Sequence, residues 1–195
     1  MENIYSRPQV LSSEEKLRLK KHKPLTVWFT GLSGAGKSTL ANMLEKELYS
    51  RNIHTALLDG DNLRGGLNRN LGFTEADRTE NLRRVAEVAK LFVESGNVAI
   101  AAFITPLESD RQMVRNIIGS DRFLEVFVAT SLEECENRDV KGLYKKARAG
   151  EIVNFTGISA PFEEPADPDL RVFTEREEPV EIVKRVLKLV EQRTK

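Results

Sequence analysis

Residues 31–38 read Gly-Leu-Ser-Gly-Ala-Gly-Lys-Ser, and this segment is the strongest indication of the fold class. It follows the apolar run Leu-Thr-Val-Trp-Phe-Thr at 25–30 and precedes a helix-forming segment, so it lies at a strand-to-helix junction. The spacing of its glycines, Lys37 and Ser38 is that of a phosphate-binding loop. A glycine-rich turn that binds nothing is the alternative, and the strand and helix on either side argue against it.

Each residue type in the loop suits an anion site. Gly34 and Gly36 let the backbone adopt conformations that a Cβ would obstruct, and the following helix offers its positive end to the same anion. Lys37 is expected to bridge the outer phosphates, and the Ser38 hydroxyl to hold Mg²⁺. The residues expected to bind the nucleotide are Gly31, Ser33, Gly34, Ala35, Gly36, Lys37, Ser38 and Thr39.

The composition favours one cytoplasmic domain. A chain of 195 residues is long enough to bury a hydrophobic core. The 30 basic and 30 acidic residues cancel, so the chain lacks the positive electrostatic field that usually accompanies nucleic-acid binding, and a nucleic-acid partner is not expected. Cys135 is the only cysteine, which excludes an internal disulfide, and two histidines give no zinc motif. Cys135 is interpreted as core filler. No apolar run reaches the roughly 18 residues of a membrane span, so a membrane partner is not expected.

Five apolar runs resemble buried strands, and helical patterns separate most of them. The expected strands are 25–30, 55–58, 98–104, 123–129 and 170–173. This alternation predicts an α/β fold of three layers, with a mostly parallel sheet and helices on both faces. Residues 1–24 are expected to form an N-terminal arm and a short helix, and residues 25–195 a single domain.

Two segments of that domain differ in kind. The clearest helix runs from about Thr74 to Ser95, and the pair Thr74 and Asp77 has capping-box spacing. The stretch from about 138 to 169 is long and rich in Lys, Gly and Pro. Its basic residues favour a lid that closes over phosphates, although a solvated charged loop would have the same composition.

A phosphate-binding loop alone does not distinguish kinases from GTPases or motor ATPases. The chain has no Asn-Lys-x-Asp sequence to read guanine, and a single small domain favours a small-molecule kinase that uses ATP. Asp59 and Asp61 supply carboxylates at the end of the second expected strand, where ligands bind in open α/β sheets. A turn in which Asp61 only caps the next helix is the alternative.

Several blocks together resemble the adenylylsulfate kinase family, whose members phosphorylate the ribose 3′-hydroxyl of adenosine 5′-phosphosulfate with MgATP. The resemblance extends from about Val27 to Leu170 and implies the P-loop NTPase fold. Besides the phosphate-binding loop, the matching blocks are Leu58-Asp-Gly-Asp-Asn-Leu-Arg64, Gly66-Leu-Asn-Arg69, Leu71-Gly-Phe73, Asp77-Arg78 with Glu80-Asn81, Lys141-Gly-Leu-Tyr-Lys-Lys-Ala-Arg148 and Phe155-Thr-Gly-Ile158.

The resemblance implies roles for residues at matching positions. Lys37 and Asp61 would be catalytic, Asp61 as the base or orienter of the accepting hydroxyl, and Arg138 would lie on the ATP side. Phe73 and Phe155 would sandwich the adenine of the acceptor. The full set implied for the acceptor is Asp61, Arg64, Phe73, Arg78, Asn81, Ile104, Lys141, Leu143 and Phe155. Thr105 stands at a serine that can be phosphorylated in some members.

Three positions depart from the family pattern. Gly65 replaces a common His, Asn70 a common Asp, and Glu108 an Arg. A reversed charge pointing into an anion site would cost on the order of a few kcal/mol, so either Glu108 faces solvent or the acceptor differs. A related kinase for another nucleotide-like acceptor and a non-catalytic regulatory subunit therefore stay open. The family also suggests a homodimer and a link to ATP sulfurylase, the enzyme that makes adenylylsulfate.

Overall fold

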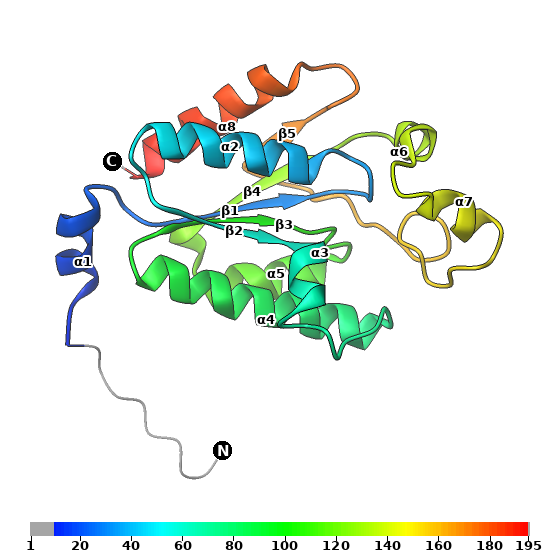
Figure 1. Ribbon diagram of the computed structural model, residues 1–195, viewed down its shortest axis with the longest axis horizontal. Helices are drawn as coiled ribbons and strands as arrows, with labels where there is room; N and C mark the ends of the chain where they lie inside the picture. Colours follow the sequence, from blue (N-terminus) through cyan, green and yellow to red (C-terminus); the bar gives the residue numbers. More distant parts are fainter. Residues whose placement is uncertain (1–9, 195) are drawn as a thin grey trace, which may run out of the picture.

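The computed structural model describes residues 10–194, which contain a five-stranded parallel sheet (Figure 1). The strand order is β2-β3-β1-β4-β5, and Val27 in the central strand pairs with Ile100 on one side and Leu124 on the other. The strands are β1 (Thr26–Thr30), β2 (Thr55–Asp59), β3 (Val98–Ala102), β4 (Phe123–Val128) and β5 (Leu170–Val172). The predicted sheet is confirmed.

Helices cover both faces of this sheet, as the three-layer prediction requires (Figure 1). One face packs against α2 (Lys37–Ser50) and α8 (Pro179–Thr194), and the other against α4 (Glu75–Glu94) and α5 (Glu108–Ile118). Alternate strand residues serve the two cores: Phe29 belongs to the α2 side and Trp28 to the α4 side, and both are fully buried. Sheets buried on both faces read as continuous apolar runs, which explains the sequence pattern.

Side chains cap the starts of two helices, and the cap at Thr74 was predicted from the spacing of Thr74 and Asp77. In α1 (Ser13–Lys20), Ser12 accepts a hydrogen bond from the Glu15 N–H at 3.2 Å, and the Glu15 carboxylate accepts one from the Ser12 N–H at 2.8 Å. In α4, Thr74 accepts one from the Asp77 N–H at 3.2 Å. Residues 1–9 of the expected arm, and residue 195, lie outside the described residues.

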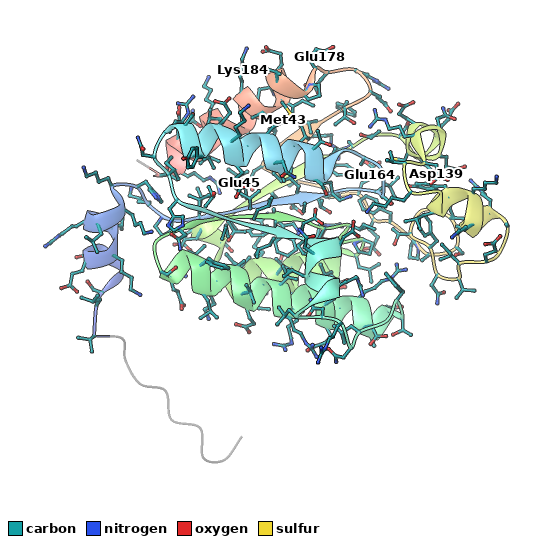
Figure 2. All side chains as sticks on the ribbon, viewed as in Figure 1. Met43, Glu45, Asp139, Glu164, Glu178 and Lys184 are labelled. Atoms are coloured by element: carbon teal, nitrogen blue, oxygen red, sulfur yellow. The ribbon has the colours of Figure 1, made fainter. Side chains whose placement is uncertain are left out.

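Three short helices carry the chain around the carboxyl ends of the strands: α3 (Gly60–Gly65), α6 (Leu132–Arg138) and α7 (Leu143–Arg148). The 3₁₀ turn η1 (Ser120–Arg122) lies at the opposite end of the sheet, just before β4 begins. Asp139, labelled in Figure 2, lies between α6 and α7 and accepts the backbone N–H groups of Tyr144 and Lys145, both at 3.0 Å. In Figure 1, α6 and α7 lie beyond the strand ends, on the side of the molecule away from α1. None of the helices within residues 10–194 has the length and apolar character to cross a bilayer.

Candidate active site

The phosphate-binding loop joins β1 to α2 and is shaped by close backbone approach. A Cβ on Gly31 would lie 2.5 Å from the Val128 carbonyl oxygen, so no other residue fits without a backbone shift. Gly36 is the N-cap of α2 with φ 101°, and no side chain caps the helix. The first N–H groups of α2 are therefore left for an anion.

Lys37 is folded back onto this loop. Its ammonium donates to the carbonyl oxygens of Gly31 at 2.9 Å and Leu32 at 2.6 Å. Burial lowers the pKa of Lys37 to about 8, because the charged form has lost its water. The ammonium is thus held by neutral acceptors that a triphosphate can replace.

Ser38 and Asp59 form a pair of oxygen ligands beside the loop. The Ser38 hydroxyl donates to the Asp59 carboxylate at 2.6 Å, and the same carboxylate accepts the Asp61 N–H at 3.0 Å. Sequence reasoning named Asp59 as a candidate carboxylate but gave it no task, because the contact with Ser38 spans 21 residues. Within residues 10–194 no cluster of three or more His, Cys, Asp or Glu could hold a metal ion. One hydroxyl and one carboxylate nevertheless suit Mg²⁺, which takes its other ligands from phosphates and water.

Asp61 pairs with Lys141 across the site. Asp61 lies in the first turn of α3, and Lys141 precedes α7, 80 residues away. The two side chains keep 73% and 57% of their exposure, so the ion pair lies at the open side of the site. The cap of α3 is Asp59, whose side chain accepts the Asp61 N–H. The alternative that Asp61 only caps a helix is therefore wrong.

Arg64 and Arg78 lie beside Phe73. The Arg64 guanidinium lies 4.4 Å from the centre of the Phe73 ring and donates to the Gly72 carbonyl at 2.8 Å. Arg78 donates to the Phe73 carbonyl at 3.0 Å, to the Thr156 hydroxyl at 2.7 Å and to the Asn154 carbonyl. Burial lowers the pKa of both arginines, because their guanidinium groups have lost part of their contact with water.

Two residues expected at the acceptor are covered in this structure, contrary to the sequence-based expectation. Asn81 is only 5% exposed and accepts a hydrogen bond from Asn68 at 2.9 Å, because the turn between α3 and α4 lies over it. Phe155 is 8% exposed and packs edge-on against Tyr144 at 5.0 Å, whereas Phe73 is 64% exposed. The two phenylalanines therefore do not form a sandwich in this conformation.

The remaining expected residues surround the same strand ends. Arg138 donates to the Thr174 hydroxyl at 2.8 Å and to its carbonyl at 3.1 Å, and that hydroxyl donates to Ala35 of the phosphate-binding loop at 2.9 Å. Ile104 follows β3, and its carbonyl accepts the Thr30 hydroxyl at 2.7 Å. Leu143 begins α7 and packs against the core on the α2 side. Ser33 and Thr39 lie within the loop and on the first turn of α2.

The reversed charge in the segment that departs from the family pattern is exposed and paired. Glu108 pairs with Arg111 at 2.7 Å, and its carboxylate is 62% exposed. Thr105 is 1% exposed, and its hydroxyl accepts a hydrogen bond from the Trp28 indole at 2.8 Å. The Thr105 hydroxyl is closed to a phosphorylating agent in this conformation. The reversed charge at Glu108 thus no longer argues for a different acceptor.

Sequence reasoning missed one contact between the 138–169 segment and the phosphate-binding loop. The Tyr144 hydroxyl donates to the Ser33 carbonyl at 2.9 Å, and burial raises the pKa of this tyrosine. Tyr144 is inside a block already singled out for its basic residues, and an aromatic residue among lysines was the available signal.

The fold and the site together define a P-loop kinase: a parallel sheet, a Gly-Lys-Ser loop before α2 and a carboxylate beside it. Residues 23–173 match the family model described as adenylylsulphate kinase, and the chain belongs to that family. It is 57% identical to the adenylyl-sulfate kinase of Bacteroides thetaiotaomicron over 93% of this chain and 90% of the relative. It is also 50% identical to the bifunctional enzyme NodQ of Azospirillum brasilense, covering 98% of this chain and 31% of NodQ.

A solved structure agrees with this assignment. The APS kinase CysC of Mycobacterium tuberculosis, in complex with AMPPNP and APS, superposes with a TM-score of 0.83 at 48% identity. The match covers 87% of this chain and 98% of the other.

Proposed function

We propose that the chain transfers the γ-phosphoryl group of MgATP to the 3′-hydroxyl of adenosine 5′-phosphosulfate, giving 3′-phosphoadenylylsulfate for sulfate assimilation. One observation carries the proposal. The phosphate-binding loop is linked through Ser38 and Asp59 to the Asp61 backbone, so the donor loop after β1 and the acceptor carboxylate after β2 lie close together at the carboxyl ends of the strands, although β3 separates the two strands in the sheet. Membership of the family and the ligands named for the mycobacterial structure support the same reaction.

The residues divide the chemistry between positioning and charge neutralisation. The α2 N-terminus and Lys37 would hold the triphosphate, and Asp61 would accept the proton of the 3′-hydroxyl or orient it. Arg64 and Arg78 would bind the phosphosulfate by exchanging protein carbonyls for anionic oxygens, which make stronger hydrogen bonds. Mg²⁺ held by Ser38, with Asp59 nearby, would neutralise charge on the transferred group.

The 138–169 segment is proposed to act as the lid. Lys141 contacts Asp61, and Arg78 bonds to Asn154 and Thr156, so the segment contacts both the carboxylate and the acceptor cations. Phe155 would have to leave Tyr144 before it could stack on an adenine opposite Phe73. Closure of the lid would exclude water from the transferring phosphoryl group.

Turnover with MgATP and a panel of acceptors tests the proposal. Adenylylsulfate should give a kcat/KM well above those of other nucleotides and small alcohols. If it gives no more turnover than the rest of the panel, the proposed reaction is refuted. Omission of Mg²⁺ should abolish turnover and leave the fold, measured by circular dichroism, unchanged.

The proposal includes an assembly and a cellular setting. A homodimer and a functional link to ATP sulfurylase are proposed from the family resemblance, and the cytoplasm is proposed as the compartment because the single cysteine is a buried free thiol. The match to part of the bifunctional enzyme NodQ supports the proposed link, because in that relative the segment similar to this chain is joined to a further part in one polypeptide. Light scattering of the purified chain tests the dimer.

A further inference from the structure

A pocket of about 210 Å³ lies where the starts of α4 and α5 meet the segment after α7. Phe73, Pro106, Leu107 and Pro161 give it apolar walls. The walls are fixed to one another: the Glu163 N–H donates to the Pro106 carbonyl at 2.8 Å, and the Glu163 carboxylate accepts the Glu108 N–H at 2.7 Å. This slot, as we call the pocket, therefore combines apolar side chains with polar ones, the combination that ligand sites usually have, and the Phe73 ring offers a surface on which an aromatic base can stack.

One buried acid lines this slot. Asp110, in the first turn of α5, is 3% exposed. Its Oδ1 accepts the Thr79 hydroxyl at 2.9 Å, whereas its Oδ2 has no hydrogen-bond partner among the described residues. Burial raises the pKa of Asp110, and the carboxylates of Glu75 and Glu163 raise it further, while Thr79 and Arg111 lower it. Asp110 lines the pocket, and this second oxygen is the part of its carboxylate that is left to accept a hydrogen bond from a ligand there.

The slot also contains a cation, because Arg78 is among its lining residues. A matching ligand has an anionic group for the arginine, a flat ring for the apolar walls and an N–H donor for the acid. Adenosine 5′-phosphosulfate has all three, and its only donor on the base is the exocyclic amine at C6. A base with a carbonyl at C6 would instead place its lone pairs against a carboxylate.

We propose that Asp110 is a specificity-determining residue, whose free carboxylate oxygen accepts a hydrogen bond from the exocyclic amine of the acceptor's adenine. The inference rests on the proposed function and extends it, because it assigns selection of the base to a residue outside the set implied by the family. Loss of a hydrogen bond to a charged group predicts a selectivity of roughly 10- to 100-fold against a base without the amine.

The experiment compares two acceptors on three proteins. The acceptors are adenylylsulfate and its hypoxanthine counterpart, inosine 5′-phosphosulfate, and the readout is the ratio of their kcat/KM values. Wild type should prefer adenine by roughly 10- to 100-fold. Asp110→Asn should lower that ratio at least about tenfold, chiefly through KM, and should improve the hypoxanthine acceptor because the new amide can donate to its carbonyl. Glu75→Gln removes the same charge from the same pocket, and should leave the ratio unchanged.

The outcomes separate this inference from the proposed function. If wild type does not turn over adenylylsulfate, the proposed function fails. If wild type does so but Asp110→Asn lowers both acceptors equally, or Glu75→Gln shifts the ratio as much, the role of Asp110 is refuted. Should Asp110→Asn not fold, wild type is assayed with the phosphosulfate of purine riboside, which lacks the C6 amine. An unchanged KM for that acceptor would also refute the role.

Discussion

The pKa of Lys37 leads to a quantitative prediction about nucleotide binding. The side chain is buried, and burial lowers its pKa from 10.5 to about 8. Above pH 8 the free enzyme increasingly holds a neutral lysine, while a bound triphosphate requires the ammonium. Each pH unit above 8 then costs about 1.4 kcal/mol of binding free energy. At pH 9.5 the loss is about 2 kcal/mol, or roughly 30-fold in affinity.

The assay is the pH profile of kcat/KM for MgATP from about pH 6.5 to 9.5, since this ratio reports ionisations of the free enzyme. It should fall above pH 8 with a slope approaching tenfold per unit, and kcat at saturating MgATP should fall later. Lys37→Arg is the matched control, because a guanidinium stays charged over this range and its profile should lack the fall even if its activity is low. A wild-type profile that stays flat to pH 9.5 would show that the ionisation of Lys37 does not limit MgATP binding in this range.

Three further variants test separate parts of the site. Asp61→Asn should lower kcat by roughly 10²- to 10⁴-fold while MgATP binding, measured by calorimetry, stays within a few-fold; normal turnover would contradict the role of Asp61 as base or orienter. Gly31→Ala places a Cβ 2.5 Å from the Val128 carbonyl oxygen, and should lower the free energy of unfolding by about 1–3 kcal/mol in urea titrations. An unchanged urea midpoint would mean that the loop backbone shifts to accept the Cβ without loss of stability. Tyr144→Phe removes the hydrogen bond to Ser33, and should lower the free energy of unfolding by about 1 kcal/mol and speed proteolysis of the 138–169 segment. A proteolysis rate equal to that of wild type would show that this hydrogen bond does not fix the segment to the phosphate-binding loop.

The sheet was predictable because its strands are buried on both faces. The runs around Val27, Ile100 and Leu124 are almost continuously apolar, which is the pattern of strands in a buried parallel sheet. In the structure Val27 pairs with Ile100 on one side and with Leu124 on the other. The third strand is shorter than expected: it ends at Ala102, whereas the apolar run continues to Ile104. The chain turns there, because Thr105 adopts φ 45° and Pro106 has no N–H for a sheet.

The site was only partly predictable, because long-range contacts decide which groups are open. The phosphate-binding loop follows from a local pattern, whereas the roles of Asp61 and Lys141 follow from the family resemblance, and the structure places all three at the carboxyl ends of the strands. Nothing near Asn81 in the sequence shows that Asn68 covers it, and nothing near Phe155 shows that Tyr144 packs against its ring. Periodicity places a residue on a helix face, but the partner across that face comes from elsewhere in the chain.

The charged groups of the site already have partners within the protein, and the strength of those partners explains how substrates can enter. Lys37 is bonded to carbonyls, Arg78 to carbonyls and a hydroxyl, and Asp61 to an exposed lysine. An exposed ion pair such as that of Asp61 contributes at most about 1 kcal/mol, and neutral acceptors give weaker bonds to cations than phosphate does. Each substrate anion would therefore replace a weaker acceptor with a stronger one. Asp110 differs in that its second oxygen has no protein partner among the described residues, so a donor on the base would not have to displace a protein group to reach it.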